Sequence, residues 1–320
     1  MTLTATDLHS QADTLLRRQT YSPRRLVLIH TAVSLGASLV LALFNLLLSS
    51  MIADTGGLSG LGTRSMLQTA QAVVELAVTL ALPFWNIGLI RASLCWARGE
   101  SAEPPTLLEG FRLFRPVLRL KILIGLVFMA VTMAVSYIST MLLILSPFSA
   151  PLTAALEPIL QESGSLDALL TDEAIAQIGS AAVPSMIFLG VIFAAVAIPV
   201  WYRIRFADFA VMDGKRARAS LLESFRATRK KSLQIFKIDL SFWWFYLLQG
   251  LSVALCYGDS ILPALGVTLP MSEEAAYILF FALGIICQGI LLWRYQARVS
   301  VTYALAYENL TATVCKETAQ

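Results

Sequence analysis

The sequence predicts an all-α, polytopic membrane protein with six transmembrane helices, internally repeated hairpins and cytoplasmic amphipathic elbow helices. Of its 320 residues, 57% are hydrophobic and 14% are charged, whereas soluble domains have about 45–50% apolar and about 25% charged residues. The apolar residues also gather in stretches long enough to cross about 30 Å of hydrocarbon as helices. We therefore expect the bilayer, rather than a soluble core, to cover most of this surface.

Polar connections separate the apolar stretches and define the expected domains. A cytoplasmic segment, residues 1–25, precedes a single membrane domain, residues 26–310, and a cytoplasmic tail, residues 311–320, follows. Backbone groups in lipid must pair within their own segment, so stretches of this length are expected to be helices. The expected spans lie at about 26–53, 66–94, 118–145, 184–206, 235–255 and 275–295.

The distribution of Lys and Arg predicts the orientation of the chain. The segment before the first span and the connections after the second and fourth spans are rich in Lys and Arg. The three opposite loops hold a single base, Arg64. Basic loops stay on the cytoplasmic side, so we expect six spans with both termini in the cytoplasm.

Two segments share the pattern [ST]-L-L-E-x-F-R-x-x-R, which indicates an internal duplication. The copies are Thr106–Arg115 and Ser220–Arg229, and each one precedes an apolar span. The spans before them also match, with Pro83-Phe-Trp85 in one and Pro199-Val-Trp201 in the other. Units that point the same way across the membrane predict a parallel repeat about an axis near the membrane normal.

Each copy has an apolar face and a basic face, which is typical of a helix lying in the membrane interface. We expect these elbows to hold their Arg side chains near anionic lipid headgroups. The alternative is a gate or a surface that docks a partner. The apolar face consists of Leu107, Leu108 and Phe111 in the first copy and of Leu221, Leu222 and Phe225 in the second.

The region from residue 218 to residue 310 combines a basic helix, an Asp-Leu-Ser-Phe motif at 239–242 with an aromatic run after it, and a closing Thr302–Glu308 segment. This region resembles a bacterial family of integral membrane proteins known as domain of unknown function 975. Phe245 stands where that family tends to have Trp, and Arg294 where it tends to have Pro. The resemblance implies a multi-pass protein of the bacterial cytoplasmic (inner) membrane, and it carries no established activity.

Ionisable side chains inside spans are functional candidates, because they are expensive to bury unpaired in lipid. Glu75, in the outer half of the second span, is a candidate proton or cation site. The alternative is a buried carboxyl that is hydrogen-bonded to Gln249 or Gln288. His30, one turn inside the first span, is interpreted as a satisfied interfacial residue rather than a proton relay.

Three arginines at the inner ends of spans form a second candidate site. Arg91, Arg203 and Arg205 would line a cytoplasmic pocket for a small anion or a lipid headgroup. The alternative is that their side chains reach the interface or pair with Asp208 and Asp239.

The sequence predicts no enzymatic activity, cofactor site or metal site. It has no phosphate-binding loop, dinucleotide fingerprint or metal-ligand set. Gly57-Leu-Ser59-Gly60 matches a serine-protease motif, but both His residues are expected on or near the opposite side of the membrane. The basic runs are expected to face lipid headgroups, so nucleic acid is not an expected partner.

Two functions are therefore left open by the sequence. The first is a non-enzymatic membrane module that assists transport or assembly. The second is a carrier that binds a small anionic solute or a lipid headgroup through the arginine pocket.

Overall fold

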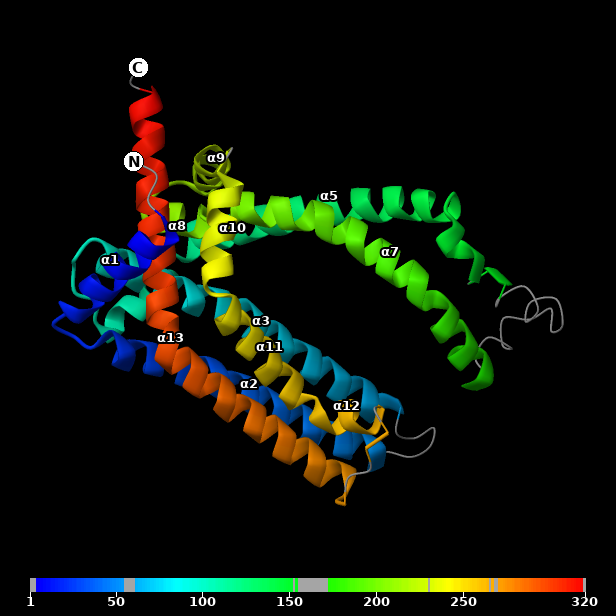
Figure 1. The fold of residues 1–320 in the computed structure, drawn as a ribbon. Helices are drawn as coiled ribbons and strands as arrows, with labels where there is room; N and C mark the ends of the chain where they lie inside the picture. The colour runs from blue at the N-terminus through cyan, green and yellow to red at the C-terminus, as the bar shows by residue number, and fades with distance from the viewer. Residues whose placement is uncertain are drawn as a thin grey trace. The chain divides into compact units, whose positions relative to one another are not determined.

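The computed structural model of the chain describes residues 4–54, 61–151, 153–154, 172–229, 231–264, 266–267 and 270–318. Helices are the only regular elements in these ranges (Figure 1), which confirms the predicted all-α class. They are α1 (Ala5–Arg17), α2 (Pro23–Asp54), α3 (Leu61–Ala97), η2 (Pro104–Leu108), α4 (Glu109–Arg112), α5 (Phe114–Ile144), η3 (Pro147–Ser149), α7 (Asp172–Ile204), α8 (Ala207–Met212), α9 (Ala217–Thr228), α10 (Ser232–Ser241), α11 (Trp243–Cys256), α12 (Gly258–Ala264) and α13 (Glu273–Thr318).

Five helices in the described ranges are long and apolar enough to cross a membrane, or six if one bent pair counts as a single span. Many large apolar side chains on these helices are exposed, among them Val40, Met133 and Val191. Exposed apolar surface on this scale is typical of a protein whose solvent is lipid. The five apolar stretches are Pro23–Leu48, Ser65–Ala97, Phe114–Ile144, Ala181–Met212 and Ala275–Ala312.

The span predicted at 235–255 is not one straight helix. It consists of α10 and α11, whose axes differ by 65°. Phe242 lies between them with φ −106° and ψ 17°, and its N–H donates to the carbonyl of Asp239 rather than continuing the helix. The Phe242 side chain is buried, with its ring edge-to-face against His9 of α1 at 4.4 Å. The bend therefore coincides with a tertiary contact, and residues 232–249 around it contain neither Pro nor Gly.

The chain divides into two compact units, each of which we describe by itself. The smaller unit, Arg119–Arg205, holds most of α5 and all of α7. Within it the rings of Phe128 and Trp201 lie 6.1 Å apart. The larger unit joins Met1–Leu118 to Phe206–Gln320.

The larger unit is built around α13, the longest helix of the described chain. This helix packs against α2, α3 and α11, and α1 lies on its C-terminal half (Figure 1). Gly284 lets α13 approach α11 closely, because a Cβ there would collide with Cys256 and with the backbone of Ser252. The four helices α2, α3, α11 and α13 thus form one bundle.

Two glycines allow the first elbow, η2 and α4, to pack closely against α3. A Cβ on Gly88 of α3 would overlap the backbone carbonyl of Leu107, and a Cβ on Gly110 would overlap the carbonyl of Phe84. The Phe84 ring also stacks on Phe114 at 4.8 Å. The elbow is therefore packed into the protein at its backbone as well as through its side chains.

The two copies of the repeated motif differ in secondary structure but agree in the exposure of their two leucines and of the variable position. The first copy is a 3₁₀ turn and a short helix, whereas the second lies mainly in the regular helix α9. In both, the first leucine is buried (Leu107 and Leu221) and the second is about half exposed (Leu108 and Leu222). The variable position of the motif is Gly110 in one copy and Ser224 in the other. Both are buried, and the Ser224 hydroxyl accepts a hydrogen bond from the backbone N–H of Phe206 at 3.2 Å.

Candidate functional site

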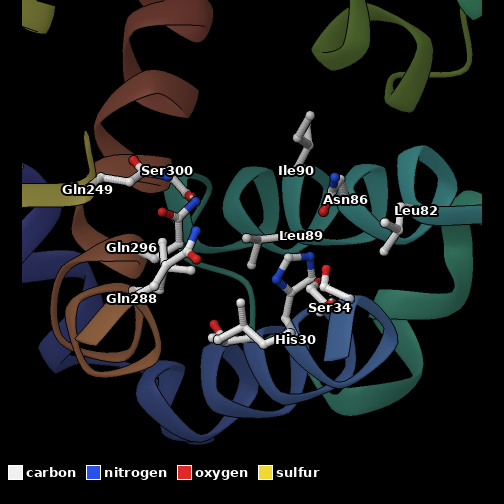
Figure 2. Close-up of a pocket in the computed structure, with 14 residues that line it drawn as sticks. His30, Ser34, Leu82, Asn86, Leu89, Ile90, Gln249, Gln288, Gln296 and Ser300 are labelled. Atoms are coloured by element: carbon white, nitrogen blue, oxygen red, sulfur yellow. Dashed lines mark hydrogen bonds between the residues drawn. The ribbon is translucent and has the colours of Figure 1, made fainter. Parts of the chain in front are cut away.

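A polar cavity of about 480 Å³ lies in the bundle formed by α2, α3, α11 and α13 (Figure 2). Its polar lining consists of hydroxyl, carboxamide and imidazole groups, and none of the described lining residues carries a carboxylate, ammonium or guanidinium group. The polar lining residues are His30, Thr31, Ser34 and Ser38 of α2, Asn86 of α3, Gln249 of α11, and Gln288, Gln296 and Ser300 of α13.

One face of α2 supplies four of these groups. Residues spaced by three or four positions share a face of a helix, so His30, Ser34 and Ser38 line up along the cavity, with Thr31 beside them. His30 and Thr31 are 8% and 4% exposed. His30 Nε2, Thr31 Oγ1 and Ser34 Oγ are buried atoms that have no hydrogen-bond partner. The His30 side chain also hydrogen-bonds with Asn86, so one of its ring nitrogens is paired and Nε2 is not.

Carboxamides supply the opposite wall. Figure 2 shows Gln288 and Gln296 of α13 facing the cavity across from His30 and Ser34. Gln296 Nε2 donates to Ser300 Oγ at 3.4 Å. Asn86 and Ser38 are exposed, so the cavity is open at their edge. Apolar side chains fill the remaining wall, namely Leu35, Leu82, Leu89, Ile90 and Leu292.

His30 is held in place from α3. Trp85 stacks on its ring in a parallel arrangement, with centroids 5.6 Å apart and planes 2° apart. The Trp85 indole N–H donates to the His30 backbone carbonyl at 3.1 Å. Trp85 therefore fixes both the backbone and the ring of the histidine, and its indole lies next to the cavity.

A second hollow, of about 550 Å³, shares Ser38 and Leu82 with the first and extends along α2 to Asn45. Close to it, Glu75 accepts hydrogen bonds from Asn45 Nδ2 at 3.0 Å and from Gln71 Nε2 at 3.1 Å. The sequence suggested Gln249 or Gln288 as partners of Glu75, but those residues line the first cavity. Glu75 as a proton or cation site stays a prediction.

The three predicted pocket arginines are not found around either cavity. Arg91 Nε pairs with Glu109 Oε2 of the first elbow at 2.9 Å, with both side chains about 30% exposed. Arg203 and Arg205 belong to the smaller unit, whereas Arg91 belongs to the larger one. A joint pocket of the three arginines thus stays a prediction.

A charged network joins distant parts of the larger unit, and the sequence did not suggest it. Arg98, just after α3, bonds to Asp213 Oδ1 and to Glu308 Oε1 at 2.6 Å each. Tyr307 donates to Asp213 at 3.0 Å, and Lys215 pairs with Glu223 at 2.5 Å. Burial alone would lower the Arg98 pKa, but the bonds to Asp213 and Glu308 outweigh it and raise that pKa overall. The available signals were the charged residues just beyond the ends of α3 and α8, Arg98 and Asp213, and the carboxylate of Glu308 within α13.

A second polar cluster surrounds the Asp-Leu-Ser-Phe motif. Tyr303 of α13 donates to Asp239, and the Tyr246 and Tyr303 hydroxyls lie 2.7 Å apart. His9 Nε2 lies 2.7 Å from Ser241 Oγ. The Ser241 hydroxyl also lies 2.6 Å from the Ile238 carbonyl, to which it can donate. Neither His9 nor Ser241 lines a described cavity, and Ser59 lies outside the described residues.

The partly buried environment of His9 predicts that α1 packs less tightly against the rest of the larger unit at low pH. Burial and the charge of Arg298 lower the His9 pKa below its ordinary value of 6.5, although Asp13 opposes them. The unfolded state therefore binds a proton more readily, and docking is weakened as the pH falls below 6.5 and is unaffected above it. Amide hydrogen exchange in Ala5–Arg17 should accelerate in acid in the wild type, relative to the intrinsic rate. His9→Gln should lose this dependence, and an unchanged pH profile in that variant would contradict the prediction.

Comparisons with protein-family models, curated proteins and solved structures return no match to this chain. The resemblance of residues 218–310 to a membrane-protein family therefore stays a prediction.

Proposed function

We propose that this protein is a non-enzymatic, multi-pass membrane module that binds a small polar solute inside its helix bundle and assists its transport. The observation that carries the proposal is the polar cavity lined by α2, α3, α11 and α13. Its lining lies on helices that are long and apolar enough to cross a membrane, with α11 as half of the bent pair. Polar groups at that depth are expensive and are typical of substrate pathways.

The energetics favour a ligand over a purely structural role. A buried polar atom without a partner costs about 1–3 kcal/mol. His30 Nε2 and Thr31 Oγ1 both carry this penalty on one turn of α2, and both line the cavity. Apolar side chains at these positions would avoid the penalty in a bundle that needed only to pack. A solute that pairs with these atoms gives a physical reason for their presence.

The placement in the membrane is part of the proposal. The bent pair α10–α11 serves as the fifth of six spans, both termini are cytoplasmic, and the membrane is the bacterial cytoplasmic membrane. The exposed Leu108, Phe111 and Leu222 support elbows that rest on the bilayer near anionic headgroups. The matching exposure of the two leucines in each motif copy supports an origin by duplication.

The carrier of an anionic solute or headgroup is less well supported. Such a site needs an available positive charge, and the Arg91 guanidinium is paired with Glu109. The cavity offers neutral groups instead. Anion binding by Arg91 would therefore require its release from Glu109.

Transport can be tested with the purified full chain in proteoliposomes. We expect the protein to accelerate entry of at least one small polar solute over protein-free vesicles, measured by uptake of radiolabelled sorbitol, gluconate and glycine. Thr31→Val removes one hydroxyl from the cavity at nearly constant volume and should slow that entry. The matched control is Thr69→Val, because Thr69 is exposed and bonds only to the carbonyl of Ser65 in its own helix. Entry no faster than in protein-free vesicles would reject the transport function.

A further inference from the structure

The lining of the cavity restricts the charge of its ligand. A charged solute that leaves water needs an opposite charge or a full set of hydrogen bonds to replace its hydration. The described lining contains His30 as its single titratable group and has no carboxylate, ammonium or guanidinium. An anion or a cation would therefore be desolvated without compensation, so the site favours a neutral molecule.

The same lining disfavours an apolar ligand. His30 Nε2 and Thr31 Oγ1 are unpartnered, lie on residues that are more than nine-tenths buried, and belong to the cavity wall. A hydrocarbon or a lipid chain would cover these atoms and leave them unpaired. The ligand must bring hydrogen-bonding groups to this turn of α2.

The chemistry of the wall matches hydroxyl groups. Each carboxamide of Gln249, Gln288 and Gln296 offers both a donor and an acceptor, and so does each serine or threonine hydroxyl. A ligand hydroxyl can likewise donate one hydrogen bond and accept others. Adjacent ligand hydroxyls can therefore pair with these wall groups either as donors or as acceptors. Leu89 and Ile90 add apolar wall against which the C–H groups of a carbon chain can lie.

We infer that the cavity binds a neutral polyol such as a hexitol, through His30, Thr31 and Ser34 on one wall and the carboxamides of α13 on the other. The inference rests on the proposed function only in taking the cavity as the solute site. The volume of about 480 Å³ falls within the range of about 300–1,000 Å³ that is typical of small-molecule pockets. The open edge at Ser38 and Asn86 gives the polyol its entry.

Binding can be measured separately from transport. The full chain in lipid nanodiscs is titrated with sorbitol, gluconate or hexanol, and saturation-transfer difference NMR reports which ligand contacts the protein. Sorbitol and gluconate differ only in a terminal hydroxymethyl against a carboxylate. We expect protein-dependent saturation of sorbitol that exceeds the empty-nanodisc signal, and no such excess for gluconate or hexanol.

Variants locate the binding. Thr31→Val and Gln288→Leu should each weaken sorbitol binding by about tenfold, equivalent to the loss of one good hydrogen bond. The matched controls, Thr69→Val and Gln234→Leu, change exposed residues outside the cavity and should bind sorbitol like the wild type. Sorbitol should also change the fluorescence of Trp85, which stacks on His30, and this change should be absent in Trp85→Phe.

The outcomes separate the two proposals. Preferential binding of gluconate or hexanol, or sorbitol binding that Thr31→Val and Gln288→Leu leave unchanged, overturns the polyol site and leaves transport standing. Absence of sorbitol binding likewise overturns the polyol site and leaves transport of another solute standing. Sorbitol binding without uptake of any solute supports the site and overturns the transport function.

Discussion

Replacement of Gly88 by alanine should destabilise the protein by about 1–3 kcal/mol, and by more if the elbow cannot move away. The added Cβ would overlap the backbone carbonyl of Leu107, and a carbonyl in a packed turn cannot rotate aside as a flexible side chain would. Gly110→Ala should have a similar effect from the other side of the contact, because its Cβ would overlap the carbonyl of Phe84. The measurement is unfolding in mild detergent, combined with limited proteolysis of the segment that follows α3.

Gly36→Ala and Gly125→Ala are matched controls for this prediction. Both glycines lie inside long helices, and nothing stands within 4 Å of a Cβ built on either one. Alanine is favoured over glycine in a helix by about 0.5–1 kcal/mol, so the controls should be neutral or slightly stabilised. If Gly88→Ala were as stable as Gly36→Ala, the elbow would not pack closely against α3 at Gly88.

Arg98→Gln should destabilise the larger unit by about 1–3 kcal/mol, because two carboxylates lose a shared partner. Arg98 bonds to Asp213 and to Glu308, and the second contact joins residues 210 positions apart in the chain. Its side chain is 33% exposed, so water compensates part of the loss and the lower end of the range is expected. Protection of the C-terminal end of α13 against hydrogen exchange should fall with the stability.

A double-mutant cycle isolates the Arg98 contact. Glu308→Gln alone should destabilise less than Arg98→Gln, because Arg98 keeps Asp213. The two changes together should cost less than the sum of the single changes. Arg218→Gln serves as the control because Arg218 is an exposed arginine of α9 and should have no effect. Strict additivity of Arg98→Gln and Glu308→Gln would show that the ion pair contributes nothing to folding.

Much of the fold could be predicted from the sequence, because the signals are local. The length of an apolar stretch can be read from consecutive residues alone. The stretches that form α2, α3, α5, α7 and α13 could therefore be recognised without tertiary information. The bend at Phe242 was not recognisable in this way. It has no Pro or Gly, and Phe242 packs on His9, which is distant in sequence.

The candidate site was predictable only in fragments. His30, Gln249 and Gln288 stood out as polar residues in apolar spans, but the sequence could not show that they line one cavity from three different helices. Arg91 was recognised as a charged residue at a span end, whereas its pairing with Glu109 depends on how the elbow folds back. Within the repeated motif, the burial of the first leucine and the exposure of the second likewise depend on which parts of the folded protein lie against them.

The position of α13 after its packing partners in the chain has a consequence for biogenesis. The helices α1, α2, α3 and α11 all pack on a helix that is synthesised after them. When α2 and α3 enter the bilayer, His30 and Thr31 have no facing wall, because the carboxamides of Gln288 and Gln296 have not yet been made. The bundle is therefore completed by association of helices that are already inserted. A chain that stops before α13 would leave the polar groups of His30 and Thr31 without the facing carboxamides of Gln288 and Gln296.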